Sequence, residues 1–343
     1  MKSLLLLASA STLAAAALGT SLQTDYTQTR SLVMTATTSL EMETTVSTME
    51  VDGEPVDRGG FGGGASLEER TVEQTYQVLA HSEGKPTKVR RAFGTVTRAT
   101  TSETGDRTSE GGGDGPLAGV VLELTLEDGE TAVEVVDGSE PDQESCLEGH
   151  GLTLAFDGLL PEGEVEADES WELSSEAIQR ALGLDREDAY FPREEADQGD
   201  EGGRRRGRRD RGSALRSLIG AEWEGEATFQ GETDHDGVAC YAIGVEFEAS
   251  GELPETGGFG RGGRGGRALG LPAAPAAENT ITAELEGRLL FSKEDGRPVL
   301  FEVEGSVSTV RDNEFERGES MMRMRSEQEG TLELRVEIAV ESE

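Results

Sequence analysis

The chain has 343 residues and a formal net charge of −38, because 69 acidic residues outnumber 31 lysines and arginines. A surface this acidic is strongly hydrated and repels polyanions, which argues against nucleic acid and anionic membranes as partners. Aromatic residues make up only 5% of the chain, so its core must be built mainly from Val, Leu, Ile, Met and Ala. The length allows two domains or one large β domain.

The first 19 residues have the features of a secretory signal peptide. Lys2 supplies a positive charge, residues 4–18 form an uncharged apolar run, and residues 17–19 are a small-x-small cleavage triplet. The apolar run is shorter than the roughly 20 residues that span a bilayer. No cysteine follows it that would carry a lipid anchor. We therefore expect a mature chain from about Thr20 that is periplasmic or extracellular, not lipid-anchored and without a membrane span.

Alternation of apolar and polar residues dominates from residue 31 onward, which predicts half-buried β-strands. In residues 31–51, one face carries Leu32, Met34, Ala36, Leu40, Met42 and Val46. Similar runs, separated by turn sequences, occupy residues 70–81, 86–100, 119–138, 151–156, 222–233, 237–250, 279–293, 297–310 and 330–341. The pattern predicts a mainly β fold, in which long antiparallel strands form a curved sheet, clam or open barrel.

Two short segments have helical spacing instead. Residues 174–184 put Ile178, Ala181 and Leu182 on one side, and a serine at the start can cap the first turn. Residues 213–220 repeat the pattern with three apolar residues and a serine. We therefore expect one or two short helices beside the sheet.

Two loops have low-complexity composition. Residues 185–212 hold an acidic stretch followed by an arginine-rich stretch, which predicts a disordered, self-neutralising polyampholyte loop. Residues 255–278 are rich in glycine and arginine. Binding of nucleic acid through these loops is disfavoured, because the arginine segment 199–213 has no aromatic residue on which a base could stack.

The order of predicted strands, loops and turns indicates an internal duplication. A strand, a Gly-Gly-Phe-Gly loop, a strand, an acidic-Gly-basic-Pro turn and a further strand occur twice. The loops are at residues 59–62 and 257–260, and the turns are at 83–86 and 295–298. Repeated markers in one order indicate a repeated unit. We expect two related β halves, residues 20–160 and 161–343.

The run LLPEGEVEADESWEL at 159–173, the strand at 237–251 and the hairpin around residues 295–298 resemble exported bacterial families of unknown function. Those families repeat antiparallel β units. More distantly, a long curved sheet with short helices resembles the open half-barrels of lipoprotein carriers, which hold acyl chains. The resemblance implies a fold and an exported protein. It assigns no role to any residue.

Several motifs look like sites and are better explained as turns or chance. Gly-x-Gly-x-x-Gly at 260–265 lacks the strand and helix that a dinucleotide site needs. Ser-x-x-Lys at 82–85 falls in a predicted hairpin turn. Residues 234–237 suit an ordinary turn as well as a calcium ion. The three histidines, His81, His150 and His235, have no zinc spacing. We therefore predict no catalytic, cofactor or metal site.

Cys146 and Cys240 are the two cysteines of the chain, and neither belongs to a Cys-x-x-Cys motif. In an exported protein an even number of cysteines suggests a disulfide. We predict one disulfide between them, joining two parts of the sheet.

We predict an exported, non-enzymatic envelope or extracellular protein, acting as a binding or structural module. Its concave β face would hold an apolar ligand or an envelope protein, with Met34, Met42 and Met49 as an adaptable wall; these residues would equally suit a plain core. A hydrolase of unfamiliar type is the alternative. It would be favoured if His150 or His235 lay beside a carboxylate and a Ser or Cys. The sequence leaves the oligomeric state open.

Overall fold

A computed structural model of the chain describes residues 19–28, 30–56, 63–105, 107–192, 214–253, 279–317 and 320–341. The apolar run of the predicted signal peptide and both Gly-Gly-Phe-Gly motifs lie outside the described residues.

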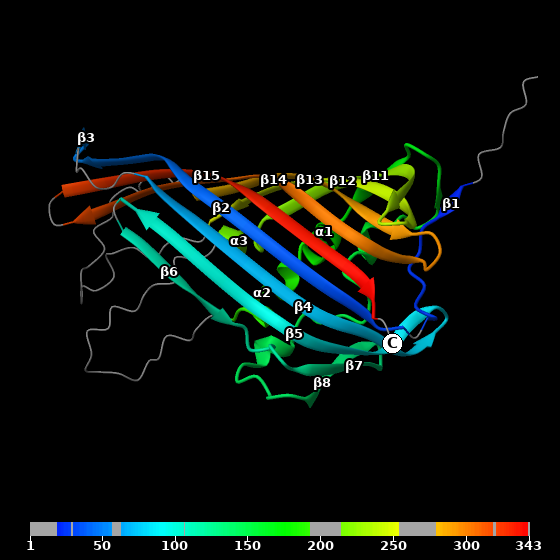
Figure 1. Cartoon of the computed structure of the whole chain (residues 1–343). Helices are drawn as coiled ribbons and strands as arrows, with labels where there is room; N and C mark the ends of the chain where they lie inside the picture. Colours follow the sequence, from blue (N-terminus) through cyan, green and yellow to red (C-terminus); the bar gives the residue numbers. More distant parts are fainter. Residues whose placement is uncertain are drawn as a thin grey trace, which may run out of the picture.

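One antiparallel sheet of 13 strands organises the described chain (Figure 1). Its strands are β2 (Leu32–Val51), β3 (Glu54–Pro55), β4 (Gly64–Ser82), β5 (Lys85–Thr104), β6 (Arg107–Asp114), β7 (Val121–Glu127), β8 (Glu130–Asp137), β10 (Ser170–Leu173), β11 (Glu222–His235), β12 (Val238–Glu252), β13 (Asn279–Ser292), β14 (Arg297–Arg317) and β15 (Ser320–Val340). The order is β10-β11-β12-β13-β14-β15-β2-β4-β5-β7-β8, with β3 beside β2 and β6 beside β5. Because β10 and β8 are separate edges, the sheet is open, and the predicted fold class is confirmed.

The two ends of the chain meet in the middle of this sheet. β15 pairs with β2 along almost its whole length, from Met322 opposite Val51 to Val340 opposite Leu32. The N-terminal and C-terminal strands therefore share one continuous surface. The proposed duplication stays a prediction, although both of its predicted units, β2-β4-β5 and β12-β13-β14, are runs of three adjacent antiparallel strands.

A β-bulge corrects one part of the predicted strand pattern. Thr44 pairs with Gln328 and Val46 with Glu327, so Thr45 is an extra residue on β2. An extra residue reverses which side chains face inward beyond it. Leu32, Met34, Leu40 and Met42 are buried as predicted, but beyond the bulge Met49 is buried and Val46 is not.

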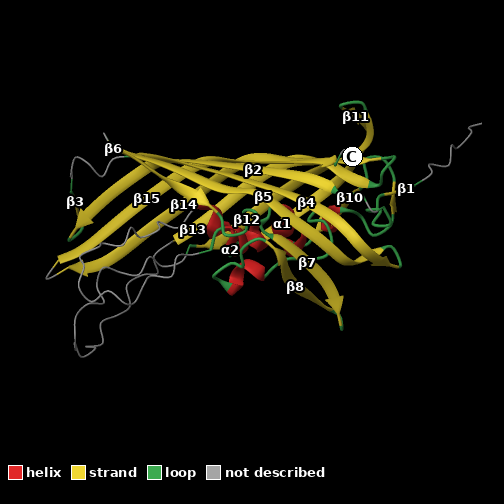
Figure 2. Ribbon diagram, turned by 60° about the horizontal axis from the view of Figure 1, so that its bottom comes forward, coloured by secondary structure: helices red, strands yellow, loops and turns green. Residues whose placement is uncertain are grey.

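An inner layer covers part of the concave side of the sheet (Figure 2). We use this name for residues 144–192 and 214–221. Its elements are the helices α1 (Ser175–Ala181), α2 (Glu187–Tyr190) and α3 (Ala214–Leu218), the 3-10 turns η1 (Glu144–Leu147), η2 (Asp157–Leu159) and η3 (Leu184–Arg186), and the short strands β9 (Glu164–Val165) and β10. β9 pairs with β1 (Thr20–Ser21) in a separate two-stranded sheet.

The predicted helices are present as α1 and α3, and the Ser174 hydroxyl caps α1 by accepting from the Ala177 N–H at 3.2 Å. The first residues of the loop predicted at 185–212 form η3 and α2 instead, and Ala189 and Tyr190 are buried there. Burial of these apolar side chains therefore orders a segment whose charges suggested disorder. Residues 193–213 lie outside the described residues, and no described helix is long and apolar enough to cross a membrane.

The main apolar core lies between the sheet and the inner layer. Ile178 of α1 and Leu218 of α3 have no exposed surface, and the ring of Phe156 lies 5.0 Å from that of Phe301 on β14. Residues 151–156, predicted as a strand, are a loop in this core. Their alternation is real, since Leu152, Leu154 and Phe156 are buried, but these side chains pack against the sheet from outside it.

Candidate functional site

Side chains of the sheet and of the N-terminal segment bind the backbone of loop 151–154, which explains why this extended segment needs no neighbouring strand. A buried backbone polar group has to find a partner. Arg91 of β5 donates to the carbonyl oxygens of Gly151 at 2.6 Å and Thr153 at 3.2 Å, Tyr76 of β4 donates to that of Leu152 at 2.7 Å, and the Tyr26 hydroxyl accepts from the Leu154 N–H at 2.7 Å.

Asp157 fastens the N-terminal segment to the inner layer. It accepts hydrogen bonds from the Tyr26 hydroxyl and, at 2.7 Å, from the Thr24 hydroxyl. Burial raises the pKa of Asp157, and burial together with the nearby Asp157 charge raises the pKa of Tyr26. The hydroxyl of Tyr26 therefore stays protonated and acts as a structural donor.

His150 lies in the core rather than in an accessible site. Its Nε2 donates to the Cys146 carbonyl oxygen at 3.0 Å, and its ring lies 6.0 Å from that of Phe93 and 6.4 Å from that of Tyr190. Burial, with Arg91 nearby, lowers the pKa of His150 to about 3, and burial raises the pKa of the Cys146 thiol. His150 thus contacts the backbone of Cys146, and the raised pKa of the thiol is the opposite of what an activated nucleophile needs.

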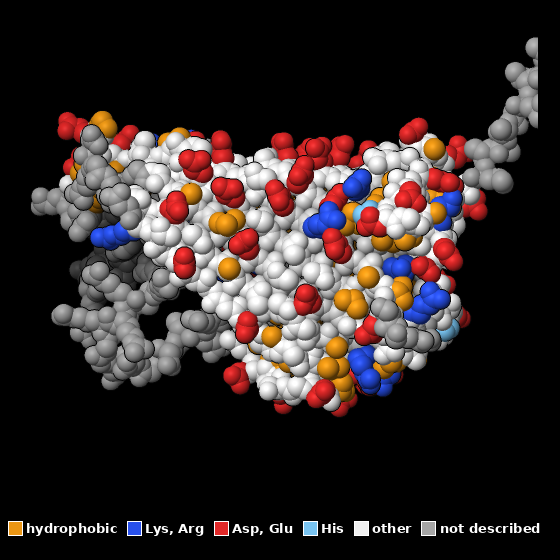
Figure 3. All heavy atoms as spheres, in the orientation of Figure 1, with side chains coloured by type: hydrophobic (Ala, Val, Ile, Leu, Met, Phe, Trp, Pro, Cys, Tyr) orange, Lys and Arg blue, Asp and Glu red, His pale blue; other side chains and the backbone are white. Residues whose placement is uncertain are grey.

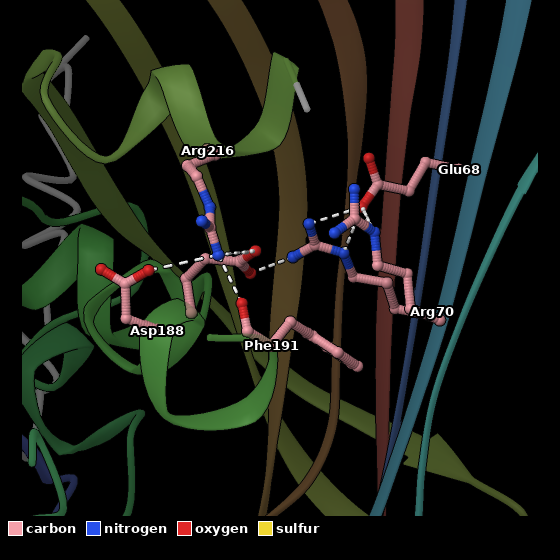
Figure 4. Close-up of polar contacts among 7 residues, drawn as sticks. Glu68, Arg70, Asp188, Phe191 and Arg216 are labelled. Carbon is pink, nitrogen blue, oxygen red and sulfur yellow. Dashed lines mark hydrogen bonds and ion pairs between the residues drawn. The ribbon is translucent and has the colours of Figure 1, made fainter. Parts of the chain in front are cut away.

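A buried ionic network joins the inner layer to β4 and β5. Arg70 of β4 forms ion pairs with Glu68, at 2.5 Å, and with Glu187 of α2. Arg98 of β5 lies 2.8 Å from Glu68, and Arg216 of α3 lies 3.7 Å from Glu187. Figure 4 shows Arg70 and Arg216 reaching toward each other from the sheet and from α3. Apart from Arg98, at 18%, these side chains are at most 9% exposed.

The network also holds the end of α2. Arg216 donates to the Phe191 carbonyl oxygen and lies 3.2 Å from Asp188 (Figure 4). The Arg70 guanidinium lies 5.1 Å from the centre of the Phe191 ring, a cation–π distance. Burial raises the pKa of Glu187 and the charge of Arg70 opposes that rise. The two helices that flank residues 193–213 are thus tied to one point of the sheet.

Beyond this network, methionines gather on the concave side. We call Met49, Met322 and Met324 the methionine end; Met42, opposite Gly330 on β15, belongs to the main core instead. Met324 lies directly opposite Met49 across β15 and β2, so both side chains project from the same face as the buried Leu332. Met49 and Met322 are each only 7% exposed, yet among the described residues they belong to neither apolar core cluster. Figure 1 shows these ends of β2, β14 and β15 extending past the helices.

The motifs that resembled sites are turns where the structure describes them. Residues 82–85 form the β4–β5 hairpin, with positive φ at Glu83 and Gly84. In the β11–β12 hairpin the Gly237 N–H donates to Asp234 at 3.1 Å, and His235 lies 3.8 Å from Asp236. His81 is exposed near the end of β4. The described ranges contain no cluster of three or more potential metal ligands. Residues 260–265 lie outside them.

The predicted disulfide between Cys146 and Cys240 is not formed. Both thiols are free and buried. Cys146 belongs to the main core, whereas Cys240 packs with Leu290 and Leu300 in a small second cluster. Tyr241 and Ile243 of the same strand contact the main core. Cys240 precedes them by one and three residues, and side chains at odd separations along a strand point to opposite faces, so the Cys240 side chain points to the other face of the sheet. The sheet itself therefore separates the two sulfur atoms.

A narrow pocket opens where the N-terminal segment crosses the end of the sheet. Its charged groups are already paired, since Asp295 lies 3.4 Å from Arg30 and 3.2 Å from Arg297. The lining comprises Thr24, Asp25, Tyr26, Gln28, Arg30, Leu32, Tyr76, Val78, Leu154, Asp295, Arg297 and Val340.

No known family model and no curated protein matches the chain. A solved structure from work on lipid–protein interactions in lipovitellin is similar, at 8% identity and a TM-score of 0.37. The similarity covers 92% of this chain and 26% of that one, so this chain spans about a quarter of its length. A likeness this weak identifies no shared ligand. Membership of an exported bacterial family stays a prediction.

Proposed function

We propose that this protein is an exported, non-enzymatic binding protein whose methionine end holds an acyl chain or a similar apolar ligand. The observation that supports this proposal is the position of the three methionines. They lie on the concave face near the ends of β2 and β15, and two of them, Met49 and Met322, are buried yet belong to neither core cluster of the described residues.

The inner layer limits where a ligand can lie. Ala221 lies against Gly251 of β12, where a Cβ atom would be 2.9 Å from the Ala221 Cα. A ligand therefore has no room over that part of β12. The proposal places it over β2 and β15 instead, at Met49, Met322 and Met324.

Methionine suits such a wall because its unbranched thioether adapts to ligands of irregular shape. Three of the seven methionines of the chain are in this one place. Met34 and Met42 lie in the main core instead. Met321 points to the outer face, where it is 43% exposed.

Export is supported by the sequence of the first 19 residues and by the position of the first described strand. β1 starts at Thr20, directly after the predicted cleavage triplet, and pairs with β9. Removal of residues 1–19 would leave this pairing intact.

A non-enzymatic role is favoured over a hydrolase by the surroundings of two histidines. His150 donates to the backbone carbonyl oxygen of Cys146, and the thiol of that residue has a raised pKa. His235 lies in a hairpin turn with Asp236 as its charged neighbour. Within the described part of the chain, neither histidine contacts both a carboxylate and a Ser or Cys side chain, as the alternative requires.

The proposal is tested by titrating the purified protein with the neutral dye Nile red and with hexadecanol. We expect saturable binding, and we expect the double variant Met49→Gln/Met324→Gln to weaken it about tenfold or more, because polar amides replace apolar contacts. Met321→Gln on the outer face is the matched control and should bind as the native protein does.

Two results would overturn the proposal. One is the absence of dye and hexadecanol binding by the native protein. The other is equal binding by the double variant and the Met321→Gln control, which would place the ligand elsewhere. A third outcome would change the ligand. If the native protein binds an envelope protein but not hexadecanol, and the same double variant abolishes that binding, the ligand is a protein and not an apolar molecule.

A further inference from the structure

Arg311 lies on the concave side of β14, next to the methionine end. It is on the same face as Val307 and Thr309, which are buried, because no bulge interrupts the pairing of β14 with β15 between them. Across the neighbouring strands it lies opposite Asn279 of β13 and Ser326 of β15. We call Asn279, Arg311 and Ser326 the polar row, because they occupy adjacent positions on three neighbouring strands of the concave face.

Arg311 makes no hydrogen bond or ion pair among the described residues, and its side chain is half-buried. Burial alone lowers its pKa. Other arginines on this face have partners: Arg70 and Arg98 meet Glu68, and Arg91 meets loop 151–154. A buried cation without a partner is costly, and such a group is commonly completed by an anion.

The acids near Arg311 in sequence lie on the other face and are already engaged. Asp312 accepts two hydrogen bonds from Arg323, at 2.9 and 2.5 Å. Glu327 lies 2.6 Å from Arg325. The inward neighbours of Arg311 are neutral, since they are asparagine, serine and threonine side chains. No carboxylate of the described chain competes for the Arg311 guanidinium.

The methionine end begins one step along the strands from the polar row. Met324 precedes Ser326 by two residues and pairs with Asn313, so it is a diagonal neighbour of Arg311. Diagonal pairs in a sheet lie about 7–8 Å apart, within reach of long side chains. One ligand could therefore touch both the guanidinium and the thioethers.

We infer that Arg311 makes the methionine end selective for amphiphiles with an anionic head group, the head lying on the polar row and the chain on the methionines. This inference rests on the proposed function, since it names the ligand class of the same surface. Carboxylate and phosphate share the chemistry that Arg311 recognises, because both accept paired hydrogen bonds from a guanidinium.

Displacement of Nile red by four amphiphiles of equal chain length tests the inference. The probes are palmitate, hexadecyl phosphate, hexadecanol and hexadecyltrimethylammonium, each below its micelle-forming concentration. Salt of about 0.15 M shortens the reach of the overall negative charge to about 8 Å. We expect at least one anionic probe to bind roughly 10- to 100-fold more tightly than hexadecanol, as charged hydrogen bonds allow.

Three variants locate the effect. Arg311→Gln should remove the preference for an anion, so that the anionic probes bind this variant no more tightly than hexadecanol does, whereas Arg311→Lys should keep part of the preference. Arg335→Gln is the control, because it removes the same charge from an exposed position on the outer face of β15. Since Arg311 makes no ion pair or hydrogen bond with the described residues, the variants should fold, which circular dichroism would verify.

The outcomes separate the inference from the proposed function. Binding of palmitate alone or of hexadecyl phosphate alone identifies the head group, and binding of both shows a general anion preference. Equal binding of hexadecanol and both anions, a preference for the cation, or an anion preference that survives Arg311→Gln would overturn the inference while the apolar site stands. If neither Nile red nor hexadecanol binds, both fail.

Discussion

Arg70 of β4 and Glu187 of α2 form an ion pair in which the two side chains are only 8% and 4% exposed. Removing one partner of a buried pair leaves the other charge without compensation. We therefore expect Arg70→Met to lower the free energy of unfolding by about 3–5 kcal/mol, measured by urea denaturation. Arg335→Met, which breaks exposed pairs with Glu302 and Glu337, should cost less than about 1 kcal/mol. Equal losses of stability in the two variants would contradict the assignment of Arg70 and Glu187 as a buried ion pair.

His150 predicts an acid sensitivity. Its pKa is about 3 in the folded protein and 6.5 ordinarily, so between these values the unfolded chain binds a proton that the folded chain does not. The free energy of unfolding therefore falls as the pH drops below 6.5, by about 2.7 kcal/mol at pH 4.5. His150→Gln should lose less stability than the native protein between pH 7 and pH 4.5. An identical loss in both would refute the role of His150.

The hydrogen bond from Tyr76 to a buried carbonyl oxygen predicts that loss of its hydroxyl lowers the stability of the fold. Tyr76→Phe removes the donor to the Leu152 carbonyl oxygen, which is buried, and should lower the free energy of unfolding by about 1–3 kcal/mol. Tyr241→Phe is a matched control, since the Tyr241 hydroxyl has no hydrogen bond among the described residues. We expect it to change stability by less than about 0.5 kcal/mol. A comparable loss in the control would show that removing any tyrosine hydroxyl has this cost, and that the bond to the Leu152 carbonyl oxygen is not responsible.

The free cysteines predict a simple chemical result. Protein denatured without reductant should titrate with two thiols per chain, and its mass should equal that of the reduced protein, because Cys146 and Cys240 face opposite sides of the sheet. In the native state both thiols should react slowly, since both are buried. A mass lower by two hydrogens would show that the disulfide expected from the sequence forms after all.

The cleavage triplet predicts the start of the mature chain. When the full-length protein is expressed in a host that exports it, the secreted form should begin at Thr20, as determined by N-terminal sequencing. Replacing Ala17 by Arg should block processing and retain the precursor. Accumulation of unprocessed native protein in the cytoplasm would contradict export.

Strict alternation predicted the long strands well, because one face of β2, β13 and β15 contacts the core and the other faces water. The outer face of the sheet carries scattered acidic side chains (Figure 3). Alternation failed at residues 151–156, where Arg91 and Tyr76 replace the backbone partners of a strand. It also missed β6, whose residues are all exposed, so burial imposes no pattern on its sequence. The bulge at Thr45 left no local signal either.

The sequence of β4 carries a signal of the ionic network. Extending the alternation of β4 backward from Val72 places Arg70 and Glu68 on the apolar face. Two charges at consecutive inward positions indicate that partners must come from elsewhere. Which partners these are could not be read from the sequence, because Glu187 and Arg216 approach only through tertiary packing. The disulfide prediction failed for the same reason, as spacing along the chain does not reveal the face of a sheet.

The pairing of β15 with β2 has a consequence for how the molecule is made. A chain emerging from a ribosome presents β2 early, but β15, which covers one edge of β2, follows all other strands of the described sheet. Until β15 arrives, that edge of β2 remains an open template for other chains. The sheet is completed only once β15 has been made, so a product terminated before β15 lacks its central strand pairing and is prone to aggregate.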